Sequence, residues 1–258
     1  MQSLPSPFKP RLDVLRAEVR AIEAAGCARV SECLPFGIAP MDSKIAAGGI
    51  LLGALHEMAG SSANIGDDAA ALLFTAGLAA RACHKGGIVL WALRWRDLFA
   101  PGLAQAGLTP ERLIQAECRR DEDVLAVMEE GLRHGGLAAV VGEVGQVTMA
   151  ATRRLQLAAE QSGTLALMLR KWRRNTVDPL AQPSSALTRW TIGCLPSAPL
   201  PVQGVGRPRW SINLVRQRGG EPYHWIMEGC DAEGRLALPA GPVHRSATAD
   251  RGAARQAA

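Results

Sequence analysis

The sequence of 258 residues, of which 48% are hydrophobic and which carries a net charge of +5, is long enough to bury one large core. Its first residues, MQSLPSPFKP, lack the apolar segment of a signal peptide, and no later run reaches the about 18 apolar residues of a membrane span. The six cysteines and five histidines are dispersed, which argues against a zinc site and a disulfide framework. We therefore expect a cytoplasmic protein without a membrane partner or a metal site.

The first predicted element in chain order is an amphipathic helix. Leu12, Leu15, Val19 and Ile22 recur at steps of three or four residues, with charged residues between them. The apolar stripe packs either on its own domain or on a neighbouring chain. Residues 1–34 are assigned to this helix and a turn-rich connector.

From residue 50 onward, short apolar segments alternate with amphipathic ones. The predicted strands are 50–55, 86–92, 113–117, 137–144 and 164–169, and the predicted helices are 67–83, 97–107, 121–133 and 148–161. Continuous apolar strands separated by helices predict the α/β class, with a mainly parallel sheet covered on both faces.

After Arg170 the sequence KWRRNTVDPLAQPSS is polar, basic and without apolar periodicity, which predicts a mobile loop. The segments ALTRWTIGCL, RWSINLVRQR and YHWIMEG then alternate apolar and polar residues, which predicts an antiparallel C-terminal extension of the sheet. The core is expected to span 35–230. Residues 231–258 are assigned to a disordered tail, most clearly from Ala240, because they become small and polar.

Residues 57–72, EMAGSSANIGDDAAAL, are similar to a phosphate-binding loop that opens a helix. Such a loop, G-x-x-x-x-G-K-[ST], surrounds phosphates with N–H groups and supplies a lysine and a hydroxyl. With Gly60 as the first glycine of the pattern, the second should be residue 65, but it comes one position late, at Gly66. Asp67 and Asp68 then take the positions of the lysine and the hydroxyl. No register supplies the cation.

Two carboxylates in this loop would repel a triphosphate, since like charges about 4 Å apart cost roughly 4 kcal/mol at an effective dielectric of about 20. As a helix start the same residues fit well: Asn64 is a good N-cap, and carboxylates in the first turn gain about 0.3 to 1 kcal/mol from the helix dipole. We expect a vestigial nucleotide loop without ATP or Mg²⁺ as cofactor; weak nucleotide binding and turnover are the alternatives. Its residues are Gly60, Ser61, Ser62, Asn64, Gly66, Asp67 and Asp68.

Glu143 ends the predicted strand 137–144, where a Walker B acid would stand. An acid at the carboxyl end of a buried strand suits a ligand site. It would equally serve as a cap or an ion-pair partner, and without the lysine this structural role is favoured.

Basic residues dominate the stretch from Arg153 to Arg218, which holds only Glu160 and Asp178 as acids. The candidate contact residues are Arg153, Arg154, Arg170, Lys171, Trp172, Arg173 and Arg174. Cations around an exposed aromatic suit single-stranded DNA, which binds through backbone charge and base stacking. A solvated basic loop and a surface for an acidic protein partner are the alternatives.

Several motifs carry a family resemblance. FGIAPMDSKIAAGGILLGALHEMAG resembles the RecA pattern with GGLPxGxIxEIxG, matched by Met41, Asp42, Gly48, Gly49, Gly53, Glu57 and Gly60. WRDLFAPGLAQAGLTPERLI, ATRRLQLAAEQSGTLALMLR, ALTRW and RWSINLVRQRGGEPYHWIMEG resemble the ImuA family, RecA-like accessory proteins of bacterial mutagenesis cassettes. The resemblance runs from about Pro35 to Gly229.

This resemblance implies a RecA-like P-loop-type core and a non-catalytic role in SOS-induced translesion synthesis and DNA-damage mutagenesis. ImuA-like proteins act with an ImuB-like Y-family polymerase homologue and, indirectly, with an error-prone replicative-type polymerase. RecA and single-stranded DNA are further implied partners, because the loop around Trp172 falls where RecA-like proteins carry DNA-binding loops. The alternative is a nucleotide-dependent, DNA-binding ATPase of the RecA type.

Overall fold

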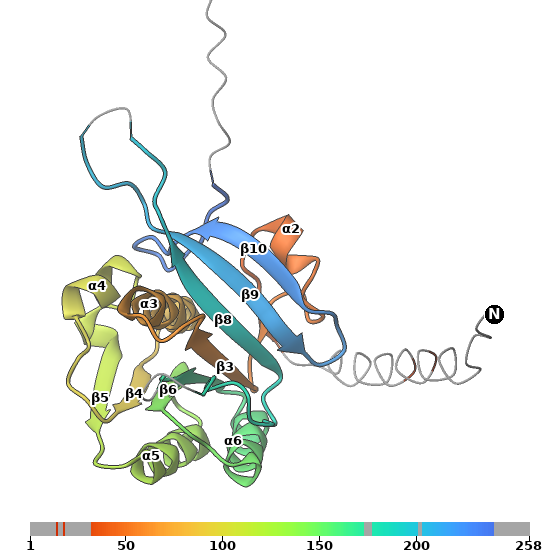
Figure 1. The fold of residues 1–258 in the computed structure, drawn as a ribbon. Coiled ribbons are helices and arrows are strands. Elements are labelled where there is room, and N and C mark those ends of the chain that lie inside the picture. Colours follow the sequence, from red (N-terminus) through yellow and green to blue (C-terminus); the bar gives the residue numbers. More distant parts are fainter. Residues whose placement is uncertain (1–13, 15–17, 19–31, 173–176, 201–202, 240–258) are drawn as a thin grey trace, which may run out of the picture.

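The computed structural model describes residues 14, 18, 32–172, 177–200 and 203–239. Within these residues an eight-stranded sheet crosses the molecule (Figure 1). In sheet order the strands are β10 (Tyr223–Glu228), β9 (Arg209–Gln217), β8 (Thr188–Leu195), β3 (Leu55–Gly60), β7 (Leu165–Arg170), β6 (Ala139–Val144), β4 (Val89–Leu93) and β5 (Leu113–Glu117).

The strand directions confirm the predicted α/β class. All neighbouring strands from β8 to β5 run parallel, whereas β9 and β10 are antiparallel to their neighbours. The antiparallel extension is confirmed for these last two strands. The first C-terminal segment, β8, joins the two parts of the sheet, because it pairs antiparallel with β9, as expected, and parallel with the central β3.

Helices cover both faces of the parallel part of the sheet (Figure 1). They are α3 (Ile65–Ala82) and α4 (Ala100–Gln105) on one face and α5 (Asp121–His134) and α6 (Met149–Ser162) on the other, whereas the short α2 (Ala39–Asp42) lies beside the antiparallel strands β9 and β10. Short 3-10 helices lie at Cys83–Lys85 and Pro110–Arg112. Successive side chains of a strand point to opposite faces. Along β7, Leu167 packs in the core that contains Phe74 of α3, and Met168 packs in the core that contains Leu155 of α6.

The strand expected at 50–55 is interrupted. Ile50–Leu51 forms β2, which pairs with β1 (Cys33–Leu34) in a separate small sheet. Gly53 then adopts a φ of +65°, a backbone conformation that favours glycine, and the chain turns before β3 begins. The strand that leads into the candidate nucleotide loop is therefore β3, five residues later than expected.

Residues at both ends of the core complete the fold. Of the predicted N-terminal helix only Val14 and Glu18 lie within the described residues, and both are helical. Part of the segment assigned to a tail packs on the core: Leu236 is buried, and Ala237 forms a bridge with Glu228. Residues 240–258 lie outside the described part. Within the described residues no helix is long and apolar enough to cross a membrane.

Candidate functional site

A cavity of about 300 Å³ lies at the carboxyl ends of the central strands, where open α/β sheets bind ligands. Four segments distant in sequence line it, together with Asp121 at the start of α5. They are residues 63–65 and 68 at the start of α3, 94, 95 and 97 after β4, 143–145 at the end of β6, and 171–172 after β7. The structure thus brings the candidate nucleotide loop, Glu143 and the start of the basic loop into one site.

The loop after β3 is held together by its own side chains. Ser62 Oγ donates to Asp67 Oδ2 at 2.7 Å and accepts from Asn64 Nδ2 at 2.7 Å. Asn64 is the N-cap of α3, as predicted: its Oδ1 accepts from the N–H of Asp67 at 2.7 Å, and its carbonyl accepts from the N–H of Asp68 at 3.2 Å. Phosphate binds at a helix start through free N–H groups, so these two are already occupied.

Gly60 makes the turn compact. A Cβ at this position would lie 3.0 Å from the carbonyl carbon of Asp67 and 3.1 Å from the backbone nitrogen of Asp68. The next residue, Ser61, donates its N–H to the carbonyl oxygen of Ile192 in β8 at 2.9 Å. The backbone at this glycine therefore packs on the helix start and on β8.

The two aspartates have different roles. The buried Asp67 turns toward β8, where its Oδ1 accepts from the N–H of Cys194 at 2.8 Å. Gly66 precedes it, and a Cβ there would lie 3.5 Å from the Cβ of Cys194. Asp68 instead lines the cavity. Asp67 therefore fastens the loop to the sheet, whereas Asp68 faces the cavity.

A lysine does reach the site, but from another strand. Lys171, which follows β7, places its Nζ 2.8 Å from Asp68 Oδ2 and 3.5 Å from Glu143 Oε2. Burial works against its charge, yet the carboxylates of Glu143 and Asp68 outweigh this effect and raise the pKa of Lys171. The ammonium therefore bridges the two acids that correspond to the hydroxyl and Walker B positions of the predicted pattern.

Glu143 is held on its other side by a tryptophan. Its Oε1 accepts from Trp91 Nε1 at 2.7 Å, and only 4% of the residue is exposed. Burial raises the pKa of Glu143, and the charge of Lys171 and the hydrogen bond from Trp91 offset part of this rise. The geometry gives Glu143 an ion-pair and hydrogen-bonding role, the favoured of the two alternatives considered from the sequence.

The cavity wall carries more acids than bases. Its acidic residues are Asp68, Asp97, Asp121 and Glu143, and its basic residues are Arg94 and Lys171. Such a wall repels a triphosphate. Within the described residues no three histidine, cysteine, aspartate or glutamate side chains are grouped so that they could hold a metal ion.

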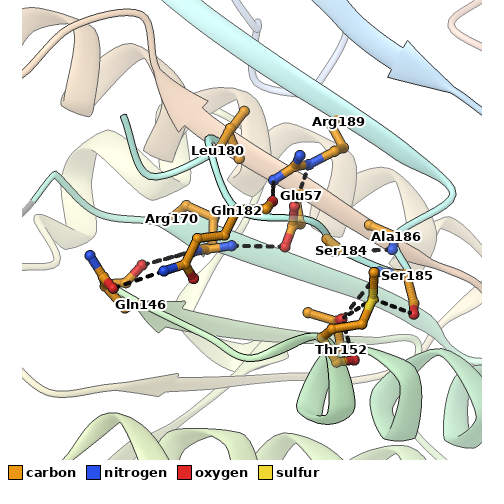
Figure 2. A network of polar contacts seen from close by, with 12 residues as sticks. Glu57, Gln146, Thr152, Arg170, Leu180, Gln182, Ser184, Ser185, Ala186 and Arg189 are labelled. Atoms are coloured by element: carbon orange, nitrogen blue, oxygen red, sulfur yellow. Dashed lines mark hydrogen bonds and ion pairs between the residues drawn. The ribbon is translucent and has the colours of Figure 1, made fainter. Parts of the chain in front are cut away.

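A second charged cluster lies deeper in the sheet (Figure 2). Glu57 in β3 is fully buried and accepts from Arg170 Nη1 at 2.9 Å and from Arg189 Nε at 2.7 Å. The same Arg170 donates from Nε and Nη2 to the carbonyl oxygen of Gly145 at 3.1 and 3.0 Å. Burial lowers the pKa of Arg170, and the charge of Glu57 opposes this shift.

This cluster also anchors the segment after the basic loop, which the sequence predicts to be mobile. Arg189 Nη2 donates to the carbonyl oxygen of Gln182 at 2.9 Å, and Gln182 Nε2 donates to Gln146 Oε1 at 3.0 Å (Figure 2). Ser185 donates its N–H to Thr152 Oγ1 at 3.1 Å. Hydrogen bonds therefore fasten residues 182–185 to β8 and α6, against the expectation of a mobile loop.

The candidate contact residues are distributed over different environments. Arg153 and Arg154 are exposed on α6, as a surface role requires, and Arg154 lies 3.6 Å from Glu129. Arg170 is only 1% exposed, which corrects its expected place in a surface loop. Trp172 is half-buried, and its Nε1 donates to the carbonyl oxygen of Gly60 at 2.8 Å. Arg173 and Arg174 lie outside the described residues.

The exposed aromatic residue at this site is one that the sequence argument missed. Trp95 lines the cavity with 64% of its surface exposed, and the guanidinium of Arg94 lies 5.2 Å from its ring centroid. Arg94 also pairs with Asp121 at 3.1 Å. The sequence RWRD directly after a buried strand was the available signal, since side chains at the carboxyl end of such a strand face the ligand edge of the sheet.

The fold and the site define an α/β protein whose central strand leads through a small-residue turn into a capped helix, with a loop that lacks its own lysine. No protein-family model matches the chain. It is 37% identical over 217 residues to the protein ImuA of two strains of Caulobacter vibrioides. The alignment covers 81% of this chain and 88% of that relative. The chain belongs to the ImuA family.

Proposed function

We propose that this protein is a non-catalytic accessory protein of the ImuA/ImuB mutagenesis system. It acts in the cytoplasm during SOS-induced translesion synthesis, where it binds an ImuB-like polymerase homologue and, through it, serves an error-prone replicative-type polymerase. Membership of the ImuA family supports the system. The bridge that Lys171 forms between Asp68 and Glu143 supports the lack of catalysis.

The Lys171 bridge is the observation that carries the non-catalytic role. In an active loop the lysine stabilises charge on the transferred phosphoryl group, and the acid and hydroxyl hold magnesium. Here the available ammonium is already paired with both carboxylates. A nucleotide would have to separate these ion pairs and enter a wall in which acids outnumber bases. Both steps oppose binding, and no loop lysine compensates for them.

A RecA-like core is the finer fold assignment that we propose. Its support is the strand, turn and helix at 55–82, the parallel arrangement around β3, and the match to the RecA pattern in which Glu57 and Gly60 take part. In this fold the backbone around the site at the carboxyl ends of the strands is kept, while capping and ion-pairing side chains stand where a nucleotide-binding loop has its phosphate-binding residues.

Co-purification tests the partner. The full-length protein and the tagged ImuB-like protein of the same bacterium are co-expressed, captured at low salt and separated by size. The proposal predicts a complex that elutes as one species. An unrelated protein of equal net charge serves as the control, because charge alone steers association at low salt. Absence of a complex with the ImuB-like protein would contradict the proposal.

A nucleotide-dependent ATPase of the RecA type is the second candidate, and one observation favours it. Asp68 Oδ1 is buried and has no hydrogen-bond partner among the described residues, although Asp68 lines the cavity beside Lys171. A ligand could satisfy that oxygen and take Lys171 as its cation. Steady-state ATP hydrolysis with and without single-stranded DNA tests this candidate. Turnover that disappears in Glu143→Gln would support it over the leading proposal.

A further inference from the structure

A larger cavity, of about 920 Å³, lies at the opposite end of α3 from the candidate site. The helix has 18 residues and is therefore about 27 Å long at 1.5 Å per residue. The groove lies between residues 34–38, the end of α3 with His84, residues 107–112, and residues 232–236. Its volume is at the upper end for ligand pockets, which suits an extended ligand.

Two arginines in this groove, Arg81 and Arg112, form no ion pair among the described residues, although the charges of Asp42 and Asp231 act on Arg81 at longer range. Arg81 donates from Nη2 to the carbonyl oxygen of Pro35, and its guanidinium lies 5.6 Å from the ring centroid of Phe36. Arg112 donates from Nη1 to the carbonyl oxygen of Cys83 at 3.1 Å. Burial lowers the pKa of Arg81, which indicates that this charge lies in a partly desolvated wall. A charge in such a wall favours an anionic ligand.

The third arginine of the groove is already neutralised. Arg235 Nη2 lies 3.1 Å from Glu233 Oε2, and this pair is exposed at the rim. Glu233 is the single acid that lines the groove. The positive charge of the groove therefore comes from Arg81 and Arg112.

The remaining lining distinguishes a protein ligand from a nucleic acid. The half-buried Leu34 and Ile38 and the buried Leu236 give the groove an aliphatic wall. Single-stranded nucleic acids bind by stacking bases on exposed aromatic rings. Phe36 is the aromatic residue of this lining, but it is only 4% exposed and Arg81 lies over its ring. The other ring of the lining is the exposed imidazole of His84, and the described lining of the groove has no exposed tryptophan, tyrosine or phenylalanine. Carboxylates and aliphatic side chains therefore fit the groove better than bases do.

The terminal segments of the chain itself do not fit as ligands. Residues 1–31 and residues 240–258 each contain more arginine and lysine than aspartate and glutamate. Their net positive charge is repelled by the two unpaired guanidiniums. The charge of the groove therefore favours a segment of another protein.

We propose that the groove around Arg81 and Arg112 binds an acidic segment with aliphatic side chains from the protein partner. Two guanidiniums bind its carboxylates, and Leu34, Ile38 and Leu236 contact its apolar side chains. This inference rests on the proposed function, since it takes the ImuB-like polymerase homologue as the partner.

The test is a charge reversal, Arg81→Glu with Arg112→Glu, in the full-length protein. Affinity for the purified ImuB-like protein is measured by calorimetric titration. We expect at least about tenfold weaker binding, because two attractive contacts become repulsive. The matched control is Arg119→Glu with Arg133→Glu, two exposed arginines of which one precedes α5 and the other lies in its last turn; it makes the same change of net charge and is expected to leave affinity within about twofold.

The outcomes separate this inference from the proposed function. If the unmodified protein does not bind the ImuB-like protein, the proposed function fails. If it binds and the groove variant binds equally well, the inference is overturned while the proposed function stands. A groove variant that keeps the partner but loses an oligothymidylate probe would likewise overturn it, in favour of nucleic acid. Should the double variant unfold, the exposed Arg112→Glu alone is expected to weaken binding, and unchanged affinity there would contradict the inference.

Discussion

Arg170 and Lys171 are consecutive residues that enter two different charged clusters. Arg170 joins Glu57 and Arg189 in the interior, and Lys171 joins Asp68 and Glu143 at the wall of a cavity. Successive residues at the end of a strand point to opposite faces, which explains the division. Both residues belong to one basic stretch in the sequence. The comparison shows that the buried Arg170 stabilises the sheet, whereas Lys171 neutralises the acids at the wall of the cavity.

The geometry of each cation suits its cluster. The planar guanidinium of Arg170 donates to Glu57 and to the carbonyl oxygen of Gly145 at the same time. The ammonium of Lys171 is a compact charge that lies between two carboxylates at unequal distances, 2.8 and 3.5 Å. We therefore expect a substitution in the first cluster to reduce the free energy of unfolding strongly, and a substitution in the second cluster to reduce it moderately.

The largest effect is expected for Glu57→Gln. It removes the one carboxylate between two buried arginines, and breaking a buried ion pair costs about 3 to 5 kcal/mol. The free energy of unfolding is measured by urea denaturation, with the exposed Glu122→Gln as the control. A loss below about 1 kcal/mol would contradict the structural role assigned to the interior cluster.

His56, the neighbour of Glu57 in β3, provides a pH test of the same interior. Burial lowers its pKa from 6.5 to about 4, and the hydrogen bond to the carbonyl oxygen of Leu51 opposes this shift. Because the unfolded chain binds the proton more tightly, stability is complete above about pH 6.5 and decreases as the pH falls toward 4. The loss is about 3 kcal/mol for such a shift. Urea denaturation at several pH values measures it.

The variant His56→Gln serves as the control for this pH effect. It removes the group that titrates, so it is expected to flatten the pH dependence between pH 6.5 and 4. An unchanged slope would show that other groups cause the loss of stability. In the folded protein His56 is hydrogen-bonded to Thr188 Oγ1 at 2.7 Å and to the carbonyl oxygen of Leu51 at 2.9 Å, so this variant also removes two buried contacts.

Lys171→Met is expected to have an intermediate effect. It keeps an unbranched apolar stem but removes the cation between Asp68 and Glu143, at a cost of about 1 to 2 kcal/mol near neutral pH. The pKa of Glu143, already raised by burial, loses the attraction that limits the rise. The destabilisation should therefore be larger at pH 7 than at pH 5. Equal losses at both pH values would contradict the bridge.

The smallest effect is expected for Arg153→Ala. This side chain is exposed on α6, and substitutions away from caps, cores and charge networks change stability by no more than about 0.5 kcal/mol. Thermal unfolding measures it. A loss above about 1 kcal/mol would show that the exposed face of α6 has a structural partner.

The sequence predicts best those elements whose signals are local. β5 lies at 113–117 as predicted, and α5 begins at Asp121 and ends before Gly135, which adopts a φ of +69°. By contrast, the strand that leads into the loop was predicted five residues too early. The segment LHEMAG, which forms β3, contains a histidine and a glutamate and does not resemble a buried strand. Only partners more than a hundred residues away, Arg170 and Arg189, make a buried Glu57 acceptable.

The loop of the candidate site was predicted from the sequence, but the ion pairs of Lys171 with Asp68 and Glu143 were not. The N-cap at Asn64 follows from local rules, and the missing lysine can be counted directly in the sequence. The contact of Lys171 with Asp68 spans 103 residues and depends on which face of β7 the lysine meets. Tertiary geometry of this kind is not encoded in spacing along the chain, so the sequence placed Lys171 in a surface loop.

The most direct test of the central claim is an equilibrium titration of the protein with a fluorescent ATP analogue and magnesium. With Lys171 paired to Asp68 and Glu143, we predict no saturable binding in the micromolar range. The control is the same titration of a RecA-type ATPase with an intact loop lysine. Saturable micromolar binding that disappears in Asp68→Ala would contradict the claim that this site no longer serves a nucleotide.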